Sequence, residues 1–464
     1  MPRRLRLPIG AGLVFFGLAV FLQRGVLVSL DGNVYWKVTQ SIVHRRSLMP
    51  VLPVGWDQLH IHTPYSSFGI GMSLWLIPFV WLQDKIDPNG QGIVTLANPV
   101  MITGCVAILV VILQRLKVRN WIAVTAALSF GVLTTALFHS TEGFAEPGVT
   151  FCLLLTVLGL LIWRDGTTRA AWLVGIGLAG SVLFRTDSVV TILPLLAIVP
   201  FVISRKTLTS TLRAWLPALL VPMFIVGAWT GWYNNLRYGS PLKAGYPGQG
   251  FTNPILWGLD QLVVSPGKGL FWYAPIVILG AVGLKASWRR ERFLTLFVAA
   301  LFVGRIIFYA RWNSPEGGVG WGPRFMLPIY ALGLIPAALW LEEKLDRPPS
   351  RRNLALAFAG LLVALGLVVN LVSVWVPYEQ YVNDIRFAKP GETQAQVDVR
   401  LNQYVHDIPA SHIVANWRRL DHARPFPLKH FDGGPSPIAV LAIGIMLGGG
   451  WLLGASRTRN PRRT

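Results

Sequence analysis

The stretch from Ser29 to Thr63 is the first polar segment after an apolar run that starts at Leu7, and it carries an early carboxylate at Asp31. A carboxylate at the mouth of a membrane helix is where a membrane enzyme would hold a general base, the group that takes a proton from an attacking hydroxyl. The plainer interpretation is a cap for the following helix, since Asp and Asn often begin helices.

A second acidic segment, FHSTEGFAEPGVTF, carries Glu142 and Glu146. Glu146 stands directly before Pro147, and proline suits the first turn of a helix. The pattern predicts either a helix cap favoured by the helix dipole or an acidic group facing Asp31 across a cleft. Paired carboxylates can activate a hydroxyl or hold a divalent metal. Glu142 is a weaker candidate for the same role.

Three cations stand where they could meet a phosphate group. Arg185, in FRTDS, lies between two apolar runs, and its anionic partner is either Asp187 or a lipid phosphate. Lys268 lies in a segment rich in Gly, Pro and aromatic residues, and Arg324 follows the Gly-rich stretch SPEGGVGWGP. Such loops can present backbone N–H groups and cations to a phosphate, although they are also ordinary turns.

The residues behind Asp31 predict the element that positions it. Val34, Val38 and Ile42 are four apart, which indicates a short amphipathic helix lying on the membrane surface. Tyr35 suits that interfacial level, because its ring is apolar and its hydroxyl polar.

Composition sets the class of the protein. Of 464 residues, 53% are hydrophobic and only 14% charged, and the mean hydropathy is +0.51. These values predict an all-α, polytopic helical membrane protein. The net charge of +21 is scattered in short clusters between apolar runs, which indicates membrane loops and excludes nucleic acid as the partner. Cys105 and Cys152 both lie in apolar runs, which argues against a disulfide framework.

Apolar runs of roughly the 20 residues that a bilayer requires predict twelve transmembrane helices. They cover residues 8–28, 96–114, 120–138, 146–163, 171–184, 187–203, 214–233, 269–284, 293–310, 325–341, 353–376 and 436–455. A further run, 65–82, is interrupted by serines, glycines and a proline.

The distribution of basic residues decides whether residues 65–82 cross the membrane. If they do not, 23 of the 42 basic residues and five acidic ones fall on the cytoplasmic side. If they do cross, most of those basic residues lie outside, against the positive-inside rule. We therefore expect an interfacial or re-entrant segment at 65–82, both termini inside, and a first extracytoplasmic loop, 29–95, that carries juxtamembrane helices.

The predicted organisation has three parts. Residues 1–376 form the main transmembrane domain, residues 377–434 a small extracytoplasmic segment, and residues 435–464 the last transmembrane helix with a basic cytoplasmic tail. The four histidines of 377–434 match no strong metal-binding spacing. The acids and cations above all lie on the outer side, so the reactive face is extracytoplasmic.

The chain contains the short motifs Asp31-Gly32 with Tyr35, Tyr65-Ser66-Ser67 through Pro78-Phe79, Glu146-Pro147, and three later segments, YGSPL, SPGKGL and WGPR. Together they resemble the GT-C superfamily of polytopic glycosyltransferases, in particular members related to protein O-mannosyltransferases and lipid A aminoarabinose transferases. The similarity covers the chain to about residue 341. Many members carry a second acid where Gly32 stands, so this chain departs from the pattern at that position.

The resemblance implies an inverting glycosyltransferase in the cytoplasmic membrane of a cell, with a polyprenyl-phosphate-linked sugar as donor and a lipid, glycan or protein as acceptor. In that interpretation Asp31 and Glu146 are catalytic, and Tyr35, Glu142, Arg185, Lys268 and Arg324 bind substrate. No cofactor is firmly implied, and a divalent metal is left open. The alternatives are a transporter or flippase of lipid-linked sugars, or a non-catalytic scaffold with the same fold.

Overall fold

The computed structural model describes residues 3–51, 64–191, 208–243, 250–318, 320–376, 391–420 and 437–457. The described residues are mostly helical, and no strand occurs among them. The chain divides into two compact units. Unit 1 comprises Met1–Leu22, Leu109–Phe138 and Gly250–Thr464, and unit 2 comprises Gln23–Ile108 and His139–Gln249.

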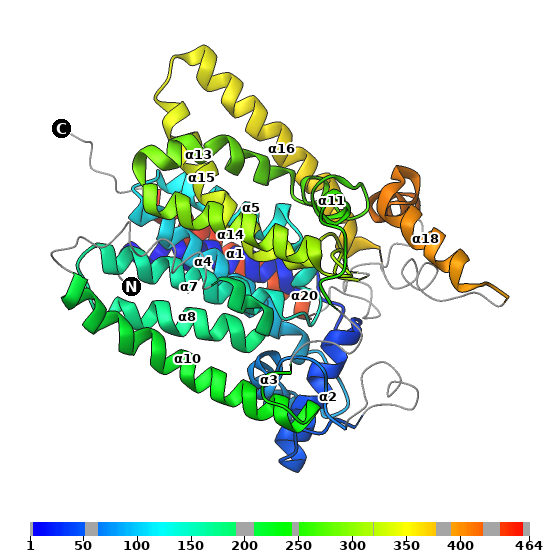
Figure 1. The fold of residues 1–464 in the computed structure, drawn as a ribbon. Coiled ribbons are helices and arrows are strands. Elements are labelled where there is room, and N and C mark those ends of the chain that lie inside the picture. The colour runs from blue at the N-terminus through cyan, green and yellow to red at the C-terminus, as the bar shows by residue number, and fades with distance from the viewer. Residues whose placement is uncertain are drawn as a thin grey trace. The chain divides into compact units, whose positions relative to one another are not determined.

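Unit 2 holds the predicted first outer loop and three long helices after it. Its elements are α2 (Leu30–Arg45), α3 (Gly71–Ile86), η2 (Val94–Leu96), most of α4 (Ala97–Arg115), α7 (Glu146–Arg164), α8 (Ala170–Phe184), η3 (Thr186–Thr191) and α10 (Leu208–Tyr238). In Figure 1, α7, α8 and α10 lie side by side, with α8 in contact with both of the others. This layer carries the loops that present Glu146 and Arg185.

The amphipathic helix predicted after Asp31 is confirmed as α2. Val34 and Val38 are buried in its packed face, and Ile42 packs against the same cluster. The helix begins earlier than a cap at Asp31 requires, because Ser29 is the N-cap and its Oγ accepts the N–H of Gly32 at 3.2 Å. Asp31 therefore lies in the first turn, where its charge is favoured by the helix dipole.

Unit 1 contains the remaining elements. They are α1 (Arg3–Phe21), α5 (Asn120–Leu133), α6 (Ala136–His139), α11 (Ile255–Leu259), η5 (Asp260–Val264), α12 (Leu270–Tyr273), η6 (Pro275–Val277), α13 (Ile278–Arg290), α14 (Arg292–Arg311), η7 (Arg324–Met326), α15 (Leu327–Leu345), α16 (Pro349–Trp375), α18 (Gln394–His406), η8 (Ile408–Ala410), α19 (His412–Arg418) and α20 (Pro437–Arg457). Helix α15 is the centre of this unit, with 94% of its most apolar window buried, and it packs against α5, α13, α14 and α16.

Seven described helices are long and apolar enough to cross a membrane. They are Val94–Arg115, Glu146–Arg164, Trp215–Tyr238, Arg292–Arg311, Arg324–Leu345, Pro349–Trp375 and Ile438–Ala455, and each matches one predicted span. Three more predicted spans correspond to the shorter apolar helices Leu5–Phe21, Asn120–Leu133 and Ala170–Phe184. The chain is thus an all-α, multi-pass membrane protein, as the composition predicts.

Three predicted segments have no counterpart among these helices. The run 269–284 is not one helix, because the chain breaks between α12 and η6 at Ala274, whose φ of −142° and ψ of 63° are not helical, directly before Pro275. Most of 187–203 lies outside the described residues. The ambiguous run 65–82 forms the 16-residue α3 from Gly71 onward, which is not among the seven long apolar helices.

Candidate functional site

The first two turns of α2 carry two of the predicted site residues. Asp31 is half-buried there, and Tyr35 follows one turn later. The Tyr35 side chain is 3% exposed, and its ring lies 5.2 Å from the ring of Phe68. Tyr35 is therefore part of the packed face that fixes α2 against the start of α3, while Asp31 is the more accessible of the two.

Glu142 joins the second acidic segment to the start of α2. Its carboxylate is buried, and Oε2 accepts the backbone N–H of Ser29, the N-cap residue, at 2.9 Å. The loop that carries Glu142 is itself held by the amide of Asn98, which donates to the carbonyls of His139 at 3.1 Å, Phe144 at 3.0 Å and Glu142. Glu142 thus fixes the turn that presents Asp31.

Two glycines allow this loop to approach α2. A Cβ at Gly32 would lie 2.9 Å from the Cα of Gly143, and a Cβ at Gly143 would lie 2.5 Å from the Cα of Gly32. The backbones touch there without side chains between them. Gly32 makes this contact. It stands where many members of the superfamily that the motifs resemble carry a second acid.

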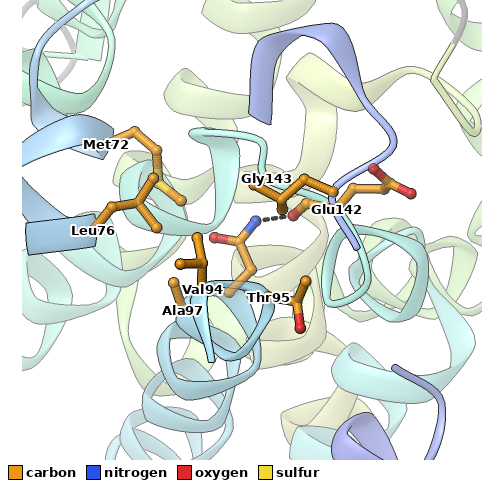
Figure 2. A pocket seen from close by; sticks show the side chains of 9 residues that line it. Met72, Leu76, Val94, Thr95, Ala97, Glu142 and Gly143 are labelled. Carbon is orange, nitrogen blue, oxygen red and sulfur yellow. Dashed lines mark hydrogen bonds between the residues drawn. The ribbon is translucent and has the colours of Figure 1, made fainter. Parts of the chain in front are cut away.

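A pocket lies beside the same loop (Figure 2). Met72 and Leu76 of α3 line it with Val94, and its polar atoms come from Thr95, Asn98 and Glu142. The pocket is a gap in the packing between α3 and the loop.

Glu146, Arg185 and Asp187 form the ion cluster of unit 2. Arg185 Nη1 lies 2.8 Å from Glu146 Oε1, and Nη2 lies 3.2 Å from Asp187 Oδ2. The Glu146 side chain is only 1% exposed, whereas that of Arg185 is 11% exposed. Arg185 thus has Asp187 as an anionic partner, as one of the two interpretations predicts, and the buried acid that begins α7 is a second partner.

Arg237 is a buried cation whose role the sequence does not reveal. Its Nη1 donates to the carbonyls of Ser66, Ser67 and Phe68 at 3.3, 2.8 and 2.9 Å. The guanidinium also lies 4.3 Å from the ring centroid of Tyr233. Arg237 therefore clamps the end of α10 to the turn before α3, and only a search for buried cations at helix ends would have found it.

Lys268 lies in unit 1 and is fully buried. Its Nζ donates to the carbonyl of Gly318 at 2.8 Å, to that of Gly322 at 3.3 Å, and to that of Gly320. Burial lowers the pKa of Lys268 from 10.5 to about 7, with Glu316 opposing the shift and Arg324 adding to it. The lysine orders the Gly-rich loop before Arg324, and the three carbonyls use its three donors.

The described part of the outer segment packs against the loop of Lys268. The N–H of Gly267 donates to the carbonyl of Val405 at 3.0 Å, and the Lys268 Nζ lies 5.4 Å from the ring centroid of Tyr404. The Tyr404 hydroxyl is 3.2 Å from Nδ1 of the buried His412, whose ring also meets Trp321. Residues 391–420 thus belong with the Gly-rich loops of unit 1.

The side chains that the structure describes form no donor set that fits a divalent metal. Among the described residues, no three His, Cys, Asp or Glu side chains form a group that could hold one. Glu146 and Asp187, which do come together, share the Arg185 guanidinium instead. The metal left open by the sequence has no set of ligands in these parts of the chain.

One buried arginine of unit 1 is not among the site residues predicted from the sequence. Arg305 interrupts the apolar run 293–310, is 1% exposed, and donates through Nη2 to the carbonyl of Phe325 at 3.0 Å. The signal was present, since an arginine inside a membrane span usually has a function.

No family model matches the chain, and no curated protein does. Solved structures match in fold. The apo oligosaccharyltransferase of Archaeoglobus fulgidus has 13% identity and a TM-score of 0.53, with 92% of this chain and 62% of that chain covered. Apo ArnT of Cupriavidus metallidurans has 14% identity and a TM-score of 0.52, with 97% of this chain and 76% of that chain covered.

The archaeal enzyme AglB, solved with an inhibitory peptide and a dolichol-phosphate, has 13% identity and a TM-score of 0.53. The chain spans 62% of its length. These likenesses concern the fold, and they confirm the resemblance to the GT-C superfamily that the motifs predict. The protein has the fold of the GT-C membrane glycosyltransferases.

Proposed function

We propose that the chain is a glycosyltransferase that moves a sugar from a polyprenyl-phosphate-linked donor to an acceptor hydroxyl at the extracytoplasmic face of the cytoplasmic membrane. The observation that carries the proposal is the arrangement of acids in unit 2. Asp31 lies in a helix turn that Glu142 fixes, and Glu146 is buried at the head of α7 with Arg185. The fold is shared with transferases, of which ArnT is known bound to undecaprenyl phosphate.

The reaction derives from these groups. Asp31 accepts the proton of the acceptor hydroxyl, whose oxygen attacks the anomeric carbon of the donor sugar. The bond from that carbon to the phosphate oxygen breaks, the phosphate takes the electron pair, and the anomeric configuration inverts. Arg185 is paired with both Glu146 and Asp187, so it positions these two acids and adds no net positive charge to unit 2. Lys268 orders the loop that ends in Arg324, the phosphate-binding candidate of unit 1.

The test is glycosyl transfer by purified protein in nanodiscs, with radiolabelled polyprenyl-phosphate sugars as donors and a membrane extract as acceptor. Asp31→Asn keeps the size of the side chain and removes the base, so we expect transfer to fall by about 10²–10⁴-fold. Glu146→Gln keeps a hydrogen-bond acceptor for Arg185, and we expect a comparable loss if it shares the chemistry. Asp165→Asn is the matched control, because that acid is exposed and pairs with Arg164.

Equal transfer by wild type and Asp31→Asn would remove Asp31 from the reaction. Saturable binding of the lipid without transfer would favour the alternatives, a transporter of lipid-linked sugars or a non-catalytic scaffold.

A further inference from the structure

Arg305 is the most deeply buried arginine among the described residues, and it lies in a helix that can span the membrane. It belongs to α14, and its side chain is 1% exposed. Its Nη2 donates to the Phe325 carbonyl at 3.0 Å and to the Tyr309 hydroxyl at 3.3 Å. Both partners are neutral, so neither balances the charge of the guanidinium.

The rest of the Arg305 guanidinium has no partner in the described parts of the chain. Nε and Nη1 are buried without a hydrogen bond. An arginine has five N–H donors, so Nε and Nη1 leave three of them unused. Leaving charged donors buried and unpaired costs free energy, and arginines within membrane spans commonly mark the path of a substrate or ion.

The surroundings of Arg305 carry further positive charge. Its guanidinium lies 5.2 Å from the ring of Tyr309, which stacks on Phe325 at 4.5 Å, and Arg324 lies 5.2 Å from the ring of Phe325. Arg324 is also close enough to Lys268 to lower its pKa, and Glu316 is the acid that opposes it. Three cations and one acid leave an excess of positive charge in this part of unit 1.

We propose that Arg305 is a binding residue for the phosphate group of a ligand, which its Nε and Nη1 donors contact while Nη2 stays on Phe325 and Tyr309. A phosphate offers several charged acceptor oxygens and suits the planar fork of an arginine. The same chemistry occurs in a lipid phosphate headgroup and in free phosphate. The assignment of the lipid rests on the proposed function, whereas the phosphate site itself rests on Arg305 and its surroundings.

The experiment measures thermal unfolding of the full chain in detergent, with undecaprenyl phosphate as one probe and inorganic phosphate as the other. Wild type should be stabilised by the lipid. Arg305→Met removes the buried charge at similar length, so it should abolish the stabilisation without lowering the Tm of the ligand-free protein. Arg305→Lys should require at least about tenfold more ligand, because a lysine lacks the planar fork. Arg292→Gln, at the exposed start of the same helix, is the control and should respond like wild type.

The outcomes point in opposite directions. A lower ligand-free Tm for Arg305→Met with an unchanged response to the probes would show a structural role and overturn the proposal. If Arg305→Met does not fold, a response of Arg305→Lys to the probes that equals that of wild type would also overturn the proposal. Stabilisation of wild type by neither probe also overturns it, and stabilisation by inorganic phosphate as well would make free phosphate the ligand.

The transfer assay separates this inference from the proposed function. Transfer by a protein that fails to respond to either probe would overturn the phosphate site and leave the glycosyltransferase intact. Stabilisation that depends on Arg305 in a protein without transfer would support the site and count against the enzyme.

Discussion

Several buried charged side chains of this protein bind other segments of the chain. Arg185 lies between two acids, with its Nη1 on the buried Glu146 and its Nη2 on Asp187. Removing one partner of a buried ion pair leaves the other charge uncompensated, which typically costs about 3–5 kcal/mol. A substitution at Arg185 therefore changes stability as well as activity, which makes Glu146→Gln the cleaner probe of chemistry.

The lowered pKa of Lys268 predicts that the stability of the folded protein depends on pH. Its pKa in the folded protein is about 7, below the ordinary 10.5, so between these values the unfolded chain binds more protons than the folded one. The free energy of unfolding must therefore rise with pH across that interval. We expect the Tm of wild type to increase from about pH 7 to about pH 10 relative to that of Lys268→Met, which has no group to titrate. Parallel Tm curves for the two proteins would contradict this.

At the scale of elements, the connection from α10 to α3 depends on one guanidinium. Arg237→Lys keeps the charge, but the lysine side chain is one atom shorter than the path to Nη1, so its Nζ cannot reach the carbonyls of Ser66, Ser67 and Phe68 together. Loss of charged hydrogen bonds of about 1.5–3 kcal/mol should raise amide hydrogen exchange around these residues about ten- to hundredfold.

Mass spectrometry of the peptide around residues 64–73 measures this exchange. Arg164→Lys is the control, since its pair with Asp165 is exposed and should contribute little. Exchange in Arg237→Lys as slow as in wild type would mean that packing of Tyr35 on Phe68 holds the turn without the arginine.

At the scale of the whole molecule, the predicted orientation in the membrane can be tested with few changes. The two cysteines described, Cys105 and Cys152, are both free and buried, so they give little background. Asp407 and Arg289 are exposed, on the predicted outer and inner sides. A membrane-impermeant maleimide should label Asp407→Cys in intact cells and Arg289→Cys only after permeabilisation. The reverse pattern would invert the topology.

Much of the fold can be predicted from the sequence, because the length and the apolarity of a membrane-spanning helix are properties of one continuous stretch of residues. The run 325–341, for example, lies within the observed helix Arg324–Leu345. The run 269–284 is an exception. Its apolarity predicts one transmembrane helix, but Pro275 lies inside it, and the missing N–H of proline favours a break there.

The candidate site was harder to predict, because its contacts join distant segments. The ion pair of Arg185 with Glu146 spans 39 positions, and no periodicity encodes it. The partners of Lys268 are backbone carbonyls about 50 residues away, which residue types do not reveal. Arg305 stands as a single charge in an apolar run, but the sequence does not reveal its partner at Phe325, 20 positions away.

The contact of Gly32 with Gly143 limits which side chains these two positions can accept. An acid at position 32 would match the pattern of the superfamily that the motifs resemble, yet its Cβ would meet the backbone of the Glu142 loop at 2.9 Å. A Cβ at position 143 would meet the backbone of α2 at 2.5 Å. A side chain at either position therefore requires the loop and the helix to move apart, which would also shift the hydrogen bond from Ser29 to Glu142 that fixes the turn of Asp31.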